Sequence, residues 1–235
     1  MLSAARLVPM GDQALIVEFG DRVDPALSAQ IAALAQRLRD SRPIGVLDIV
    51  PAYATLALHY DPAAVGAGAS PYEALSETIG TWLKTQTFEP AQTGRLVEIP
   101  VCYGGALGED LDALAVRHGM TPEEVIALHS APTYHAHMLG FVPGFAYLGG
   151  LDSRLATPRR ETPRPRVPAG SVAIADEQTA VYPLETPGGW HLIGRTPLRL
   201  FRPEASPPSL LAAGDSVRFV PISTEAFERQ RDAAS

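Results

Sequence analysis

The stretch Phe141-Val142-Pro143-Gly144-Phe145-Ala146-Tyr147-Leu148-Gly149-Gly150 opens the part of the chain that decides the fold. From Phe141 to Pro221 there are twelve prolines, and the apolar runs between them are short. Such frequent interruption by proline and glycine is typical of a barrel of short strands, and not of a parallel sheet with crossover helices. The runs that we expect to form strands are Ser171–Ala175, Ala180–Tyr182, His191–Ile193, Leu198–Phe201 and Ser216–Val220.

The residues just before this region add one strand and two helices. Arg95–Tyr103 is an apolar run that predicts a strand, and Asp110–His118 predicts a short helix. Thr121-Pro122-Glu123-Glu124 is a capping box with proline at the first helical position, so a second helix should begin there and end near His129. Together with the short strands, these elements predict a β-barrel domain over residues 95–235.

The first 88 residues show a different pattern, in which strands and helices alternate. Asp24-Pro25 and Ser70-Pro71-Tyr72-Glu73 are helix starts, because each has a capping side chain followed by proline at the first helical position. Two amphipathic helices can cover one face of a four-stranded antiparallel sheet. We therefore predict an α+β, two-layer domain of order β-β-α-β-β-α over residues 1–88, with a linker at Phe88–Gly94. The four predicted strands are Arg6–Pro9, Gln13–Phe19, Ile44–Val50 and Ala54–Tyr60.

The composition limits the class of protein. The 235 residues carry a formal net charge of −7, 46% of them are hydrophobic, and the single cysteine excludes a disulfide-stapled scaffold. The first ten residues contain no export signal, which predicts a cytoplasmic protein. Val125–Leu151 has no charged residue, but prolines, glycines and histidines interrupt it, so we do not expect it to span a membrane. An acidic chain repels a phosphate backbone, so nucleic acid is not an expected partner.

The basic residues are 18 arginines and one lysine, and five of the arginines lie within thirteen residues. A GC-rich coding bias can produce the same excess of arginine over lysine, so only the positions of the arginines can indicate a function. In this stretch only Glu161 has the opposite charge. For Arg154 and Arg166 a solvated surface is the favoured interpretation. Prolines fix the backbone around the other three, which favours recognition of an anion by their forked donors. The five are Arg154, Arg159, Arg160, Arg164 and Arg166.

Aromatic and glycine residues flank this arginine group on both sides. Phe145 and Tyr147 precede it, and Tyr182 and Trp190 follow it, among glycines that permit close approach of the backbone. An aromatic wall with a few polar groups is typical of a small-molecule pocket, although prolines and glycines that merely turn a barrel are the alternative. The substrate-binding candidates are Phe145, Tyr147, Arg159, Arg164, Gln178, Tyr182, Trp190, Arg195 and Thr196.

Other kinds of site find less support. The phosphate-loop pattern needs a lysine after glycine, whereas Lys84 follows Leu83, so any ATP would bind to another surface or another chain. His135 and His137 would share one side of a strand, but no nearby carboxylate or cysteine completes a metal site. His129 is the first candidate for a general acid or base, because imidazole titrates near neutral pH. A histidine at a helix end can also simply complement the helix dipole.

Four phrases of this sequence resemble the KipI family, which includes components of 5-oxoprolinases and proteins labelled allophanate hydrolase subunit 1. The resemblance implies a cyclophilin-like β-barrel and a role in a complex with the A and C subunits of a 5-oxoprolinase. Such a complex cleaves 5-oxoproline, a small carboxylate, to glutamate, using ATP with Mg that the complex binds, and this chain alone would have little activity. The alternatives are an inhibitor of a sensor histidine kinase and a component of a urea- or allophanate-processing enzyme. The four phrases are Gly140–Leu151, Pro158–Arg160, Val167–Ile174 and Pro187–Pro197.

The resemblance also implies a role for the arginines. Opening a lactam with ATP suggests phosphorylation of the amide oxygen and then attack by water. Arg160 would be catalytic there, holding the substrate carboxylate or the transferring phosphate. Asp176 and Ala180 replace glycines expected around Gln178-Thr179, so a side chain would crowd this turn and Asp176 would add negative charge near the anion site. Lys84 follows Leu83 and not methionine, so no biotin is expected on this chain.

Overall fold

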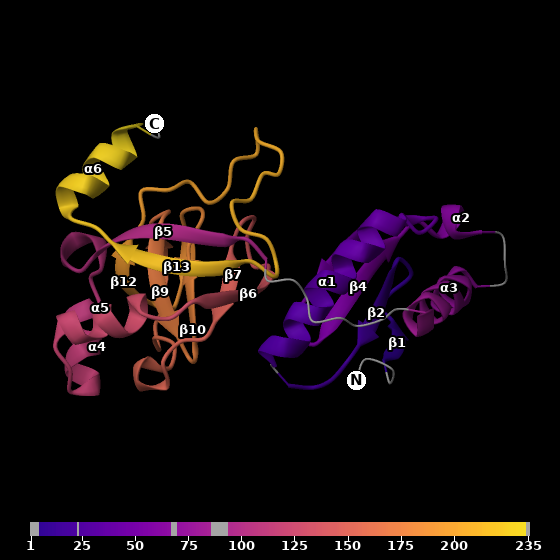
Figure 1. Ribbon diagram of the computed structural model, residues 1–235, viewed down its shortest axis with the longest axis horizontal. Coiled ribbons are helices and arrows are strands. Elements are labelled where there is room, and N and C mark those ends of the chain that lie inside the picture. The colour runs from indigo at the N-terminus through magenta and orange to yellow at the C-terminus, as the bar shows by residue number, and fades with distance from the viewer. Residues whose placement is uncertain (1–4, 23, 67–69, 86–93, 234–235) are drawn as a thin grey trace. The chain divides into compact units, whose positions relative to one another are not determined.

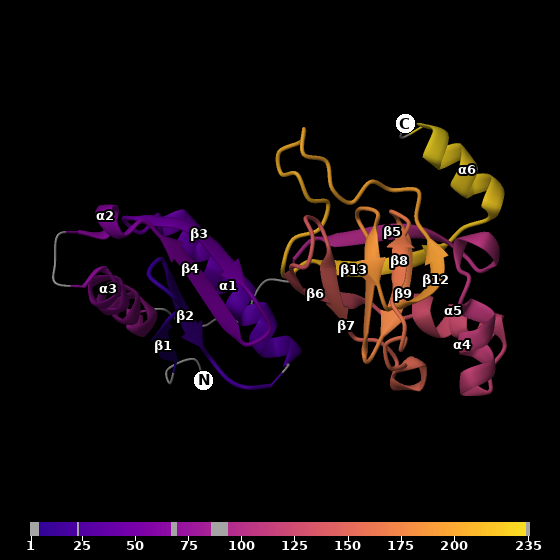
Figure 2. The same ribbon diagram turned by 180° about the vertical axis from the view of Figure 1, so that it is seen from behind.

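The computed structural model describes residues 5–22, 24–66, 70–85 and 94–233, and the chain forms two compact units (Figures 1 and 2). We call Met1–Thr93 the N-terminal unit and Gly94–Ser235 the barrel unit. The predicted linker at Phe88–Gly94 lies outside the described residues, apart from Gly94.

The N-terminal unit contains a four-stranded antiparallel sheet with the strand order β1-β2-β4-β3. The predicted order of strands and helices is confirmed, with one additional short helix, α2. Apolar side chains from the sheet and from two long helices form one core, as a two-layer arrangement requires. The elements are β1 (Arg6–Pro9), β2 (Ala14–Glu18), α1 (Pro25–Ser41), β3 (Val46–Pro51), β4 (Thr55–Tyr60), α2 (Pro62–Val65) and α3 (Pro71–Thr85).

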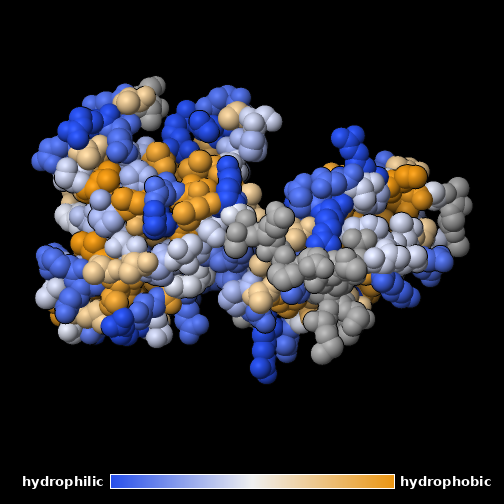
Figure 3. Space-filling model, in the orientation of Figure 1, coloured by the Kyte–Doolittle hydropathy of each residue, from blue (hydrophilic) through white to orange (hydrophobic). Residues whose placement is uncertain are grey.

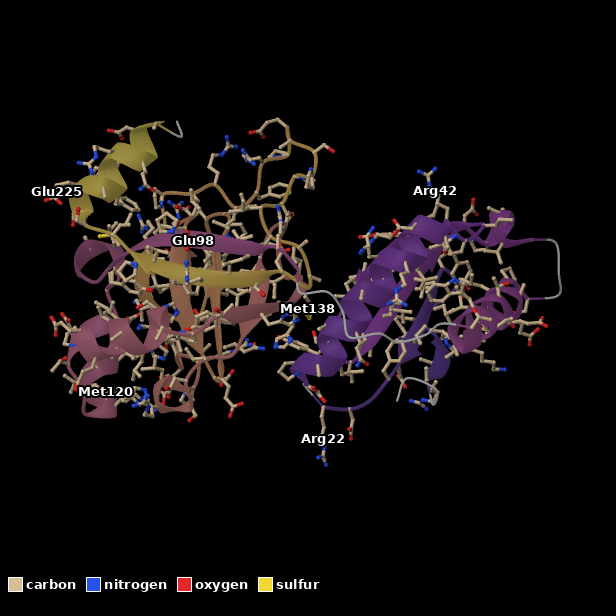
Figure 4. All side chains as sticks on the ribbon, in the orientation of Figure 1. Arg22, Arg42, Glu98, Met120, Met138 and Glu225 are labelled. Carbon is tan, nitrogen blue, oxygen red and sulfur yellow. The ribbon has the colours of Figure 1, made fainter. Side chains whose placement is uncertain are left out.

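Both long helices of this unit begin where the sequence predicts. Asp24 caps α1 by accepting hydrogen bonds from the backbone N–H groups of Ala26 and Leu27. Ser70 accepts one from the N–H of Glu73 at the start of α3. The helix α1 ends at Arg42, which adopts a left-handed conformation with φ of 46° and whose side chain points away from the helix in Figure 4. Local capping chemistry thus sets these helix boundaries.

The barrel unit is built on a closed seven-stranded barrel with the order β10-β7-β6-β13-β5-β12-β9. All neighbouring strands are antiparallel except β5 and β13, which run parallel and lie side by side in Figures 1 and 2. The barrel interior is filled by a large cluster of buried apolar side chains. The strands are β5 (Leu96–Tyr103), β6 (Tyr134–Leu139), β7 (Ala146–Gly149), β9 (Ser171–Ala175), β10 (Gln178–Val181), β12 (His191–Arg195) and β13 (Ser216–Pro221).

Helices and a second small sheet surround the barrel. The predicted capping box of α5 is present in both halves, between Thr121 and Glu124. Phe227 is the buried residue of α6, and Figure 3 shows mainly hydrophilic residues over this helix. The elements are two short 3₁₀ turns, Gly105–Leu107 and Ser153–Leu155, the helices α4 (Leu111–His118), α5 (Pro122–Ser130) and α6 (Thr224–Ala233), and the strand pair β8 (Arg164–Val167) and β11 (Thr186–Gly188).

The strand predictions are wrong in two respects. Leu198–Phe201 is not a strand, because only Phe201 makes an isolated bridge, to Ser209. Prolines at 197 and 203 flank this run, and proline cannot donate to a strand ladder. The strands β6, β7, β8 and β11 are not among the expected strands, and glycine or proline, whose propensity is against strands, occurs in β7, β8 and β11.

Candidate functional site

Arg160 and Arg164 converge on one buried carboxylate, that of Asp110. Arg160 Nη1 lies 3.0 Å and Arg164 Nη2 lies 2.7 Å from Asp110 Oδ1. Asp110 Oδ2 accepts the backbone N–H of Leu192 at 2.7 Å. Burial alone would raise the pKa of Asp110, but the hydrogen bonds from Arg164 and Leu192 and the nearby charges lower it, so this carboxylate is ionised at neutral pH. Segments before α4, before β8 and within β12 meet at this carboxylate.

Four of the predicted aromatic residues form one cluster. Phe145 is buried, and its ring centroid lies 5.0 Å from that of Tyr147, 5.3 Å from that of Tyr182 and 5.7 Å from that of Trp190. All three contacts are edge-to-face, the geometry that aromatic quadrupoles favour. The Arg159 guanidinium carbon lies 5.9 Å from the centre of the Trp190 ring. The cluster is therefore a mostly buried aromatic core with a cation at its edge.

Tyr182 supplies a polar atom to this cluster. Burial raises its pKa to about 12, although the nearby Trp190 backbone and Arg159 charge act in the other direction, so its hydroxyl stays protonated at neutral pH. Gly188 makes room for this hydroxyl, because a Cβ atom at that position would lie 2.3 Å from Tyr182 Oη. A protonated phenol beside the arginines can donate a hydrogen bond to an anion.

The arginines at the ends of the group lie on the surface, as favoured from the sequence. Arg154 pairs with Asp152 at 2.7 Å, and Arg166 pairs with Glu185 at 3.7 Å. All five arginines thus have a carboxylate partner. Within the stretch itself the only acidic residue is Glu161. The partners lie outside the stretch, and they are Asp110, Asp152, Asp176 and Glu185.

Only one of the two expected effects of Asp176 is found, the negative charge near the candidate arginines. Asp176 adopts a left-handed conformation with φ of 52°, which asparagine and aspartate tolerate better than most residues. Its backbone exchanges two hydrogen bonds with Thr157, and its carboxylate lies 3.5 Å from Arg159 Nε. The side chain is exposed and does not crowd the turn. Ala180 is buried in β10 opposite Ala173, where its methyl group is part of the core.

His129 is buried in the barrel core, which corrects the expectation that it is a general acid or base. Tyr103 Oη lies 2.8 Å from its Nδ1, and Thr179 Oγ1 lies 2.9 Å from its Nε2. Thr179 donates its own proton to the carbonyl of Ala173, so it accepts from His129 Nε2, and Nδ1 accepts from Tyr103. Desolvation lowers the pKa of His129 to about 3. The ring also stacks on Phe219 with centroids 4.6 Å apart, so His129 is part of the packing of the barrel core.

Three predicted residues remain, and they lie in or directly after the strands β10 and β12: Gln178, Arg195 and Thr196. Thr196 is buried, and its N–H donates to the carbonyl of Gly170, whose own N–H donates to the carbonyl of Tyr182. Arg195 is the last residue of β12, and burial lowers its pKa. Gln178 begins β10, beside the turn that carries Asp176.

The two histidines of β6 lie together, as the strand periodicity predicts. The ring centroids of His135 and His137 are 5.3 Å apart. Burial lowers the pKa of both, that of His137 to about 4. Within residues 5–22, 24–66, 70–85 and 94–233, no group of three or more His, Cys, Asp or Glu side chains is arranged to hold a metal ion. None of the helices in these ranges has the length and apolarity to cross a membrane.

Asp110 is the residue that the sequence reasoning missed. The sequence places it at the start of the predicted Asp110–His118 helix, where aspartate usually caps the first turn. In the structure it precedes α4 but makes no side-chain capping bond. No local pattern could have shown this, because the arginines that it binds lie 50 and 54 residues further along the chain.

Similarity to known proteins defines the class. Residues 5–211 match the family model of the carboxyltransferase domain, subdomain C and D, and the chain belongs to this family. Two curated relatives are more specific, and each is named as the B subunit of 5-oxoprolinase. The Bacillus subtilis (strain 168) protein is 41% identical over 234 residues, 96% of each chain. The Escherichia coli O157:H7 protein is 42% identical over 221 residues, 94% of this chain and 97% of the relative. The resemblance to 5-oxoprolinase components is thus confirmed.

A solved structure shares the fold of this chain. The crystal structure of TTHA0988 has a TM-score of 0.79 and 41% sequence identity to this chain. The match covers 90% of this chain but only 40% of TTHA0988. The same fold therefore occurs as one part of a longer polypeptide.

Proposed function

We propose that the chain is the B subunit of a multisubunit, ATP-dependent 5-oxoprolinase, which opens the lactam ring of 5-oxoproline to give glutamate. The observation that carries this proposal is the identity of 41% and 42%, along nearly the whole length, to two proteins of that name. The A and C subunits of the enzyme are the proposed partners, and the cytoplasm is the proposed location. The complex binds ATP with Mg, and this chain carries no biotin. The names of these two relatives favour this function over the kinase-inhibitor and urea-processing alternatives.

The barrel unit supplies the proposed substrate site. We take it to be a cyclophilin-like domain, separate from the N-terminal domain. The aromatic cluster around Phe145 would contact the apolar ring of the lactam, while Arg160 and Arg164 bind its carboxylate. Arg159, held over Trp190, adds a third positive charge at the edge of the cluster. Support comes from the convergence of two guanidinium groups on one buried carboxylate, with the exposed Glu109 as a further partner of Arg164.

The chemistry that these residues offer is binding and charge neutralisation. Opening the ring adds water across the amide C–N bond, and the terminal phosphoryl group of ATP ends as inorganic phosphate. Negative charge develops on oxygen during both changes, and fixed guanidinium groups stabilise it without reorganisation. In this proposal Arg160 contributes by holding the substrate carboxylate, and His129 has no role.

Reconstitution tests the proposed function. The purified A and C subunits are assayed with 5-oxoproline and ATP, with and without this chain, and ADP release is measured together with 5-oxoproline loss. We expect coupled turnover only when the chain is present. Equal turnover in its absence would refute the enzyme role.

A further inference from the structure

Asp110 is held in place by more hydrogen bonds than an ordinary surface aspartate. One carboxylate oxygen accepts from Arg160 and Arg164, and the other accepts the N–H of Leu192 at 2.7 Å. Its own backbone N–H donates to the carbonyl of Leu192 at 2.9 Å. Because main chain and side chain are both anchored on β12, the carboxylate has a fixed position against the barrel wall.

This use of Asp110 is not explained by helix capping. An aspartate in the N-cap position normally accepts a hydrogen bond from the first turn of its helix, which stabilises the helix. Asp110 precedes α4 and makes no such bond, since its side chain is directed to the arginines and to β12. The carboxylate therefore binds the two arginines and leaves the first turn of α4 without a side-chain cap.

The arginines retain donors that none of the described groups satisfies. Among the described residues, Arg160 Nε, Arg164 Nη1 and Arg195 Nε are buried without a hydrogen-bond partner. A buried donor left unpaired destabilises the fold, and more so when it is charged. Near Asp110, two positive charges face one buried negative charge, and Glu109 is exposed and lies 3.6 Å from Arg164. These unpaired buried donors on three arginines point to an oxyanion as the missing partner.

We propose that Asp110 is a positioning residue, which orients Arg160 and Arg164 so that their remaining donors bind a small oxyanion. The inference rests on the proposed function, and two groups in that reaction have this chemistry: the carboxylate of 5-oxoproline and a phosphate of ATP. The carboxylate is the expected ligand because the aromatic cluster can contact the lactam ring beside it. Asp110 does not touch the ligand itself.

The test compares two Asp110 variants in the assembled three-component complex. Asp110→Asn keeps an acceptor for the Leu192 N–H but loses the charge that holds the arginines, and Asp110→Glu restores that charge. We expect Asp110→Asn to raise the KM for 5-oxoproline at least about tenfold, with a smaller change in kcat and in the KM for ATP. Asp110→Glu should recover part of the loss. The matched control is Asp152→Asn, which breaks the exposed pair with Arg154 and should leave both KM values unchanged.

Each outcome decides a different point. A rise in the KM for ATP instead of that for 5-oxoproline would support the oxyanion site and identify phosphate as its ligand. Unchanged KM values for both in a folded, assembled Asp110→Asn complex would overturn the inference. If that variant does not fold, Arg164→Lys keeps the positive charge but removes the fork, and the same KM shift is expected. Failure of the unsubstituted complex to consume 5-oxoproline would refute the proposed function instead.

Discussion

Replacing His129 by leucine should reveal a pH dependence that is built into the barrel core. His129 is neutral in the folded protein, where burial lowers its pKa to about 3 from the ordinary 6.5. In the unfolded chain it takes up a proton below about pH 6.5, so the unfolded state binds more protons than the folded state between these two values. The stability that this histidine contributes is fully present above pH 6.5 and is lost as the pH falls toward 3.

The magnitude follows from the size of the pKa shift. One pKa unit corresponds to about 1.4 kcal/mol, so wild-type protein should lose about 2 kcal/mol from this group between pH 7 and pH 5. In His129→Leu the Tyr103 hydroxyl loses its acceptor inside the core, which costs about 1–3 kcal/mol at pH 7. Leucine does not titrate. The difference in unfolding free energy between wild type and variant should therefore shrink by about 2 kcal/mol at pH 5.

The assay is urea unfolding at pH 7 and at pH 5, followed by the fluorescence of Trp190 in the barrel unit. Both proteins carry Trp82→Phe, so that the N-terminal unit does not contribute to the signal. Protonation of the other histidines cancels in the difference between the two proteins. A difference that is the same at both pH values would refute the neutral, buried assignment. Loss of turnover in a folded, assembled His129→Leu complex would restore a catalytic role for this residue.

Two further substitutions, each with a matched control substitution, test the site and its packing. Arg160→Ala should reduce 5-oxoproline cleavage by the reconstituted complex at least about tenfold, or about 1.4 kcal/mol, whereas Arg154→Ala should not; turnover at the native rate would remove Arg160 from the proposal. Gly188→Ala should lower the unfolding free energy of the barrel unit by about 1–3 kcal/mol, because the new methyl group collides with the Tyr182 hydroxyl. Gly80→Ala meets open space in α3 and should stabilise the chain by about 0.5–1 kcal/mol; equal melting temperatures for the two alanine variants would contradict this reasoning.

The N-terminal unit was readily predicted because its signals are local. Asp24 caps the helix that follows it, and the same is true of Ser70. Apolar periodicity then identified four strands and two long helices in the right order. In the barrel unit the prediction of Leu198–Phe201 was wrong, because an apolar run between prolines has the composition of a strand but lacks the partners to form one.

The sequence predicts which residues of the candidate site come together better than it predicts what each residue does. The aromatic residues around Phe145 do come together, and Arg160 and Arg164 do converge. His129 has the chemistry of a general base, but burial removes that role by lowering its pKa to about 3. Burial depends on β9, β10 and β13 closing around it, which no spacing of residues reveals.

Sequence alone determined the alternation of elements, the helix starts and the family, since these depend on contacts between near neighbours or on long matching phrases. Tertiary structure decided which arginines are exposed, that His129 is buried and which aspartate Arg160 and Arg164 contact. Asp110 meets Arg160 and Arg164 only because α4 and the segment leading into β8 both dock against β12. Charge and burial act through space, and the barrel brings into contact groups that are 50 residues or more apart in the chain.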